Sequence, residues 1–245
     1  MLKHRIIPIV LVDGFSVLKT VNFSTRRNLG SPITIMRTYE TRNVDEMVLL
    51  DIDATAQNRY FDPWLVKEIS AGCFMPLTIG GGITSCMQIE NLLRAGADKV
   101  SVNTVTLYNL EFVSEAVNEF GSQCIVASVD INSDGSINTR RSFAPNIEDH
   151  IKRLIDCNIG EFLFSDVGRD GTMSGPNLEL AKQLAGSTTK PIIFAGGVSK
   201  PSDCSDLIEY SKVDAVGCSS IFHFTGFTPE DCRNNLRERG LPARS

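Results

Sequence analysis

Short runs of apolar residues recur along the chain, and longer segments of mixed polarity separate them. The runs lack the strict alternation of a half-exposed strand, so they are typical of strands that are buried on both faces of a parallel sheet. Eight such strands are predicted, at residues 5–12, 47–53, 76–82, 99–104, 124–130, 161–167, 191–197 and 214–220.

The segments between these strands have the spacing and the end signals of helices. One runs from the Thr/Ser pair at 84–85 to Gly96, and another begins at Asn109 and ends at Gly121. Eight strands, each followed by a helix, within 245 residues predict a (β/α)8 barrel. A doubly wound open sheet is the alternative, although it usually has fewer strands over this length. No Pro-rich or Gly/Ser-rich linker interrupts the chain, so residues 1–245 are expected to form one domain.

The two halves of the sequence resemble each other. Residues 77–104 match residues 192–220, and the matched pairs include Gly81 with Gly196, Gly82 with Gly197, Asp98 with Asp214 and Asp51 with Asp166. A similarity of this length predicts two repeated (β/α)4 half-barrels, at about residues 1–122 and 123–245, fused into one barrel.

Composition and charge make several classes of partner and ligand improbable. The formal net charge is −5 and basic residues do not cluster, so nucleic acid is not expected as a partner. The apolar run near the start is too short to span a membrane, and it lacks the cleavage site of an export signal. Seven cysteines without a Cys-x-x-Cys pair are typical of reduced thiols, which points to a cytoplasmic protein. The three histidines are far apart, so no metal site is expected, and the sequence gives no sign of a cofactor.

Glycines end two of the predicted strands, and hydroxyl residues end the strands that follow them. Gly82 and Gly197 end the third and seventh strands, while Thr104 and the pair Ser219-Ser220 end the fourth and eighth. Glycine lets the backbone approach an anion, and free N–H groups at a helix start attract phosphate. Two such sites on opposite sides of a barrel predict a ligand with a phosphate at each end. Tight turns between strand and helix, without a ligand, are the alternative explanation.

Acidic residues stand at or just beyond the ends of three predicted strands. Asp51, Asp130 and Asp170 would lie over the active-site end of a barrel, where a carboxylate of raised pKa transfers protons. An aspartate that caps a helix is the more frequent case, but no capping motif follows Asp130. The polar, Gly-rich stretch 165–177 is typical of a loop that contacts a ligand, with a solvated loop as the alternative.

Four charged residues stand at the opposite ends of the strands. Arg5, Glu46, Lys99 and Glu161 lie at or just before the starts of the first, second, fourth and sixth strands. Two bases and two acids around this end of a barrel could form mutual ion pairs and seal it. Scattered surface charge is the alternative, which spacing alone does not exclude.

Several motifs together resemble one enzyme family. They are RIIP, VNF, LDI, GGGI, LLRAGADKVSVNT, FGSQCIV, RDGTMSG, SIFHF and the closing LRERGLP. With these motifs, over nearly its whole length, the chain resembles the cyclase subunit of imidazole glycerol phosphate synthase, a histidine-biosynthesis enzyme. The resemblance implies a (β/α)8 barrel, a substrate with two phosphates, and a glutaminase partner that docks on the strand-start face to form a heterodimer. In this family the partner's ammonia passes a ring of four charges, crosses the barrel and attacks the substrate.

The resemblance also implies roles for individual residues. Asp130 matches one of two catalytic aspartates, and Lys19 matches a lysine on the mobile first loop. The positions that match phosphate sites are Gly82, Asn103, Thr104, Asp170, Gly171, Gly197, Ser219 and Ser220. The ammonia gate corresponds to Arg5, Glu46, Lys99 and Glu161, and the partner-facing surface to Asp98 and Gln123.

One residue that the resemblance requires is missing. The family carries its other catalytic aspartate in a CLDVKDG-like segment, whereas this chain reads IVLVDG, with Leu11 in place of the acid and one residue fewer before the glycine. Loss of a general acid or base costs about 10²–10⁴ in rate. Asp13 lies two residues after Leu11, so its side chain could point to the same face of the strand. It would stand about 6 Å further along the strand than Leu11 does. The loop after Asp130, at 131–146, also differs from the family's usual one.

Leu11 favours a divergent paralogue of the family. The resemblance extends to paralogues found beside surface-polysaccharide genes, which are held to pass ammonia to a third protein that forms acetamidino groups on sugars. Two alternatives stay open: a working cyclase that makes imidazole glycerol phosphate and an aminoimidazole carboxamide ribotide, and a non-catalytic protein that only conducts ammonia. A related single-chain ribotide isomerase is disfavoured by RIIP, FGSQ and SIFHF.

Overall fold

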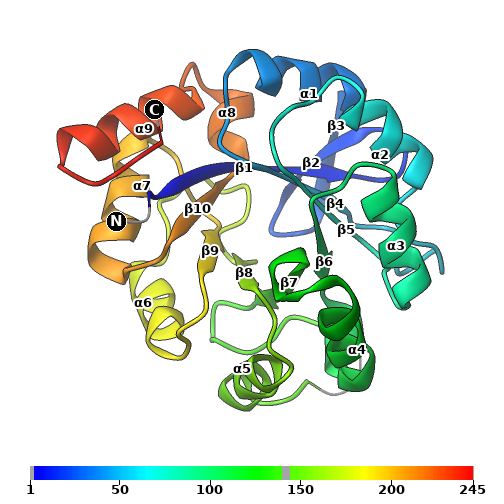
Figure 1. Ribbon diagram of the computed structural model, residues 1–245. Helices are drawn as coiled ribbons and strands as arrows, with labels where there is room; N and C mark the ends of the chain where they lie inside the picture. Colours follow the sequence, from blue (N-terminus) through cyan, green and yellow to red (C-terminus); the bar gives the residue numbers. More distant parts are fainter. Residues whose placement is uncertain (1–2, 140–143, 245) are drawn as a thin grey trace.

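A closed barrel of eight parallel strands forms the centre of the computed structural model, which describes residues 3–139 and 144–244 (Figure 1). The strands are β1 (Arg5–Val12), β4 (Met47–Asp51), β5 (Leu77–Gly80), β6 (Lys99–Val102), β7 (Ile125–Ile131), β8 (Glu161–Asp166), β9 (Ile192–Ala195) and β10 (Ala215–Cys218). Each strand pairs with the next in parallel, and β10 pairs with β1, which closes the ring. The predicted (β/α)8 barrel is therefore confirmed.

Helices surround the barrel on its outer side (Figure 1). They are α1 (Pro32–Thr41), α2 (Pro63–Ser70), α3 (Cys86–Arg94), α4 (Leu110–Phe120), α5 (Ile147–Asp156), α6 (Leu178–Gly186), α7 (Pro201–Asp206), α8 (Ser220–Phe224) and α9 (Pro229–Glu238), with short turns η1 (Thr104–Leu107), η2 (Ser122–Cys124) and η3 (Leu207–Ser211). The predicted helix ends hold, because Ser85 caps α3, Asn109 caps α4, and Gly121 follows α4 with a positive φ of 88°. Across 3–139 and 144–244, no helix combines the length and the apolar character that a bilayer crossing needs.

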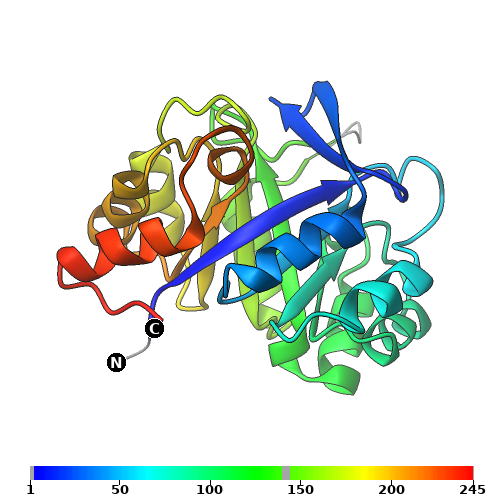
Figure 2. The same ribbon diagram turned by 90° about the horizontal axis from the view of Figure 1, so that it is seen from above.

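A β-hairpin that the sequence pattern did not predict interrupts the first β/α unit. Its strands are β2 (Val17–Val21) and β3 (Thr25–Gly30), and β2 pairs antiparallel with the end of β1. Figure 2 shows the hairpin at one end of the barrel and the chain termini at the other. The hairpin therefore belongs to the mouth, which is the end where the strands finish.

Side chains fill the barrel in tiers. Alternate residues of each strand point inward, as the period of a strand requires. The buried apolar side chains inside are Ile7, Ile9, Leu11, Val48, Val126, Leu163, Ile193, Ala195 and Ala215, with Leu50 and Ile52 packed against them. A second and larger apolar cluster lies between the strands and the helices. The interior is thus apolar at mid-height, between a charged tier at the strand starts and a polar tier at the mouth.

The two half-barrels repeat the same backbone contacts. Asp98 accepts a hydrogen bond from the N–H of Leu77 at 2.8 Å, and Asp214 accepts the equivalent bond from Ile192 at 2.9 Å. Each aspartate thereby ties the loop before its strand to the strand before it. These equivalent contacts are compatible with the predicted repeat, which stays a prediction.

Candidate active site and charge ring

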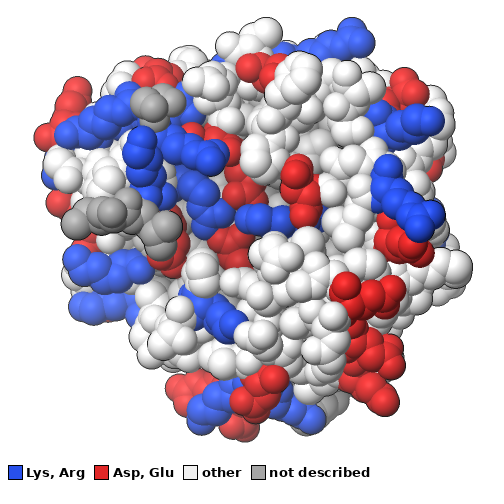
Figure 3. Space-filling view, in the orientation of Figure 1, with Lys and Arg blue, Asp and Glu red and all other residues white. Residues whose placement is uncertain are grey.

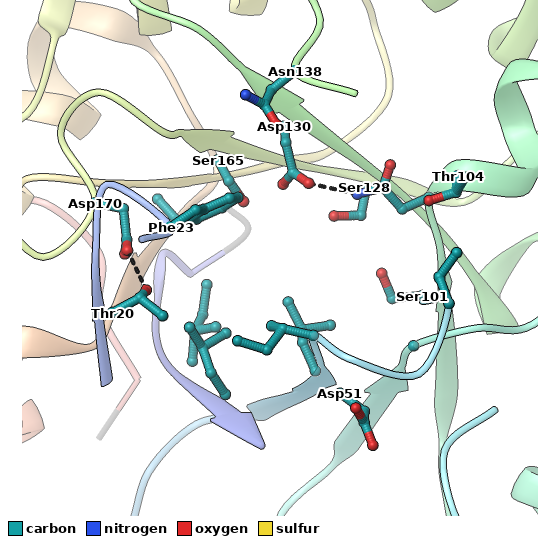
Figure 4. Close-up of a pocket in the computed structure, with 18 of the residues that line it drawn as sticks. Thr20, Phe23, Asp51, Ser101, Thr104, Ser128, Asp130, Asn138, Ser165 and Asp170 are labelled. Atoms are coloured by element: carbon teal, nitrogen blue, oxygen red, sulfur yellow. Dashed lines mark hydrogen bonds between the residues drawn. The ribbon is translucent and has the colours of Figure 1, made fainter. Parts of the chain in front are cut away.

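A cavity of about 670 Å³ opens at the mouth of the barrel (Figure 4). Its lining includes Asp130, Leu11 and all eight residues matched to phosphate sites, namely Gly82, Asn103, Thr104, Asp170, Gly171, Gly197, Ser219 and Ser220. Residues from both halves of the sequence therefore face one space, which is the arrangement that a ligand with two separated phosphates needs.

Glycine is required at the predicted phosphate positions for a steric reason. Gly82 and Gly197 have positive φ values of 66° and 84°, and a Cβ at either would collide with a neighbouring backbone carbonyl. Gly171, with φ of 71°, lies equally close to the carbonyl of Thr20 in the hairpin. These glycines therefore permit close backbone packing, whether or not a phosphate binds beside them.

Asp130 stands at the end of β7 and faces the cavity (Figure 4). Its Oδ2 accepts a hydrogen bond from the side-chain amide of Asn103 at 2.8 Å. Burial raises the pKa of Asp130 to about 6, although hydrogen bonds from Asn103 and Ser165 oppose the rise. A carboxyl group with this pKa exchanges protons near neutral pH, so Asp130 has the properties of a general acid or base.

Leu11 lines the same cavity. Leu11 is 7% exposed and packs inside the barrel with Ile9, Leu50 and Ile52. Asp13, two residues further on, accepts hydrogen bonds at its Oδ1 from the N–H groups of residues 15 and 16 at 3.1 and 2.8 Å. That carboxylate holds its own turn together.

Asp51 makes its contacts within the loop after β4 and does not cap α2, whose N-cap is Asp62. Its carboxylate pairs with Arg59 and accepts hydrogen bonds from the N–H groups of Asp53 at 3.1 Å and Ala54 at 3.0 Å. Arg59 also donates to the carbonyl of Asp13 at 3.1 Å. Asp51 therefore organises the loop after β4.

Three serines at the mouth were not singled out from the sequence. Ser101, Ser128 and Ser165 line the cavity beside Asp130 (Figure 4). The Oγ of Ser101 is buried and has no hydrogen-bond partner among the described residues. A buried hydroxyl without a partner costs free energy, so it is a place where a bound polar molecule would be stabilised. The signal was present in the sequence, because Ser101 and Ser128 interrupt apolar runs at inward-facing positions.

The β2–β3 hairpin is fastened over the mouth through Asp170. Its carboxylate pairs with Lys19 Nζ at 3.2 Å and accepts a hydrogen bond from the hydroxyl of Thr20 at 2.6 Å. The Asp170 carbonyl also accepts from the N–H of Asn22 at 2.9 Å. Lys19, expected on a mobile loop, thus lies in strand β2 with its side chain 2% exposed. Arg26, in strand β3 of the hairpin, forms a bidentate ion pair with the carboxylate of Asp53, at 2.6 and 2.8 Å.

The four charges at the strand starts form a closed ring of ion pairs. Arg5 pairs with Glu46 at 2.8 Å and with Glu161, and Lys99 pairs with the same two carboxylates at 2.8 and 3.0 Å. Burial opposes ionisation of Glu46, but Lys99 and Arg5 outweigh it and lower the pKa of Glu46. Figure 3 shows acidic and basic side chains side by side at the centre of this face.

Asp98 and Gln123 lie on the strand-start side as well. Both residues are exposed, and Gln123 Nε2 donates to the carbonyl of Phe120 at 3.4 Å. Their position is compatible with the partner-facing surface that the resemblance implies, which stays a prediction. Residues 140–143 of the loop after Asp130 lie outside the described residues.

Two comparisons with known proteins agree with this geometry. A model of the family described as "Histidine biosynthesis protein" matches residues 5–228. A Campylobacter jejuni protein of serotype O:2, provisionally named imidazole glycerol phosphate synthase subunit hisF2, is 38% identical over 248 residues, which cover 100% of this chain and 99% of that protein. Together with the barrel, these matches show that the chain belongs to the histidine biosynthesis protein family, as a HisF-type cyclase subunit of imidazole glycerol phosphate synthase.

Proposed function

We propose that this HisF-type subunit receives ammonia from a glutaminase partner and passes it through the barrel, but no longer catalyses efficient cyclisation. The ammonia goes to a third protein that amidates a sugar for surface-polysaccharide synthesis. The observation that carries the proposal is the contrast between the two ends of the barrel: the charge ring is complete, whereas Leu11 stands at the cavity where the resemblance calls for a second catalytic aspartate beside Asp130.

The ring and the interior support a route for ammonia. The four paired charges join the starts of four strands, and we propose that the closed ring keeps bulk water and ions out of the barrel. Above it lies a buried apolar tier that includes Ile7, Val48 and Leu163. An apolar tier strongly disfavours a charged ammonium ion, whereas neutral ammonia crosses at lower cost. At the mouth the buried hydroxyl of Ser101 offers ammonia its first polar contact.

The mouth supports binding more clearly than cyclisation. Ring closure needs one group that donates a proton and another that accepts one. Asp130 supplies one such group, but Leu11 and the apolar residues around it supply none, and Asp13 is bound to its own turn. We therefore propose that the phosphate positions still hold a phosphorylated small molecule and that Asp130 interacts with ammonia as it leaves the barrel.

Growth and association experiments test this function together. The gene is expressed in a bacterium that lacks its own cyclase subunit, and the tagged protein is also purified from cells that produce a HisH-type glutaminase. We expect no growth without histidine and a 1:1 complex with the glutaminase. Growth without histidine would support the alternative of a working histidine-pathway cyclase, and failure to bind the glutaminase would remove the basis for ammonia transfer.

A further inference from the structure

A buried arginine lies behind two members of the charge ring. Arg233, on α9, is 2% exposed, and its Nη1 donates to the carbonyl of Asn43 at 2.7 Å. The same nitrogen pairs with Asp45 Oδ1 at 3.4 Å, while Asp45 Oδ2 accepts from the N–H of Ile6 at 3.2 Å. Glu230 also pairs with Arg233, at 2.6 Å. The guanidinium is therefore fixed on several sides within the fold.

The position of this network in the chain connects it to the ring. Asp45 directly precedes Glu46, and Ile6 directly follows Arg5, and those two ring residues pair at 2.8 Å. The Arg233–Asp45 pair thus holds the backbone beside an acid and a base of the ring at the same time. A shift of either backbone would move a carboxylate or a guanidinium away from its partner.

The C-terminal tail reinforces the same place. Arg244 Nη1 donates to the carbonyl of Asp45 at 2.8 Å, and the N–H of His4 donates to the carbonyl of Pro242 at 2.7 Å. The residues on both sides of the Arg5–Glu46 pair are therefore tied to α9 or to the segment after it. Arg233 is the buried centre of this attachment.

We propose that Arg233 is a positioning residue for the charge ring, acting through Asp45 and the N–H of Ile6. It keeps Arg5 and Glu46 in register so that the ring stays closed. Apolar groups of similar size often stabilise a fold as well as a buried ion pair does, so stability alone does not explain why Arg233 and Asp45 are charged. A role in positioning the ring residues does explain it. The role of the ring in ammonia passage rests on the proposed function, whereas the geometry does not.

The test uses the full-length chain without partner or substrate. The variants are Arg233→Met, Arg233→Lys, and the double variant Arg233→Met/Asp45→Asn, which removes both buried charges and so avoids an unpaired carboxylate. Arg239→Met is the matched control, because Arg239 lies at the end of the same helix but pairs with Asp206 and Glu209 on the surface. NMR measures the hydrogen exchange of the Lys99 ammonium group and the pKa of Glu46.

We expect exchange at Lys99 to rise at least about fivefold in whichever Met variant folds, which corresponds to about 1 kcal/mol in the equilibrium that opens the ring. The pKa of Glu46 should rise toward its ordinary value in the same Met variants. Arg233→Lys should keep both the Lys99 exchange rate and the Glu46 pKa near their wild-type values, and Arg239→Met should change neither. Unchanged exchange and an unchanged Glu46 pKa in a folded variant would overturn the inference, as would an equal effect of Arg239→Met. Because neither readout involves a glutaminase, failure here is distinct from failure of the proposed function.

Discussion

Replacing Glu161 by Gln gives a direct measure of how strongly the charge ring is held. The carboxylate of Glu161 pairs with both Arg5 and Lys99, and its side chain is 8% exposed. In the variant, two cations share the single carboxylate of Glu46. The change is nearly isosteric, so lost charge pairing dominates the effect and lost packing contributes little.

The burial of the four side chains sets the expected magnitude. Exposed ion pairs contribute about 0–1 kcal/mol, and breaking a fully buried pair costs about 3–5 kcal/mol. Arg5 and Lys99 are 20% and 22% exposed while their partners are almost buried, so the ring lies between these limits. We expect Glu161→Gln to lower the free energy of unfolding by about 2–3 kcal/mol, which corresponds to a fall in Tm of about 4–12 °C for a chain of this size.

Urea unfolding at pH 7.5, followed by circular dichroism, measures this loss. The matched control is Glu209→Gln, which removes an exposed pair with Arg239 and is expected to cost no more than about 1 kcal/mol. High salt should narrow the difference between wild type and Glu161→Gln only slightly, because a half-buried ring is poorly screened. A loss below about 0.5 kcal/mol for Glu161→Gln, or one equal to that of the control, would refute the picture of a closed, tightly paired ring.

Three further changes test the mouth and the fold. Asp130→Asn should stabilise the protein by up to about 3 kcal/mol above pH 7 and by little at pH 4. The reason is that the pKa of Asp130 in the folded state, about 6, exceeds its value in the unfolded state, so ionisation above this pH destabilises the folded wild type. Equal urea midpoints of the variant and the wild type at pH 8 would contradict this. Asp170→Asn should loosen the hairpin held through Lys19 and Thr20, which proteolysis within residues 17–30 would detect as faster cleavage. Burial lowers the pKa of His150 to about 4, so His150→Gln should weaken the loss of stability between pH 6.5 and 4, measured as a smaller pH slope of the unfolding free energy.

The barrel was predictable because its strands carry a strong signal. Residues 5–12 form β1 as predicted, and the other seven strands begin within one residue of their predicted starts. The hairpin was missed because β3 is exposed along nearly its whole length, so its sequence, TRRNLG, has no apolar pattern to detect. Its stability comes from contacts with Asp170, which is distant in sequence, and no local pattern reports such contacts.

The sequence predicted which residues line the site where the two halves repeat, but it did not predict the hydrogen-bond and ion-pair partners of the acidic side chains. The glycines and hydroxyl residues at the strand ends converge on one cavity, and the four strand-start charges pair, as their positions suggested. The sequence could not tell that Asp51 is occupied by Arg59 or that Asp13 closes its own turn. The burial of Arg233 could not be predicted either, because the sequence of α9 is strongly polar and does not indicate which of its arginines is only 2% exposed.

The paired charges and Asp130 lie at opposite ends of this barrel. The closed charge ring and the apolar interior are formed by residues at the strand starts and inside the barrel, and the proposed function gives them the supply of ammonia. Asp130 and Leu11 both line the cavity at the strand ends. Under the proposed function, a substitution at the mouth changes cyclisation while the charge ring stays closed.

A steady-state cyclase assay tests the central claim most directly. The purified chain is given the bisphosphorylated ribotide and saturating ammonium salt at pH 8, and formation of imidazole glycerol phosphate is followed, with an authentic HisF cyclase as the positive control. The account predicts product at least about 10²-fold below that control, the factor associated with a lost general acid or base. Turnover comparable to that of the control would show that cyclisation does not need a carboxylate at position 11, and the account would be contradicted.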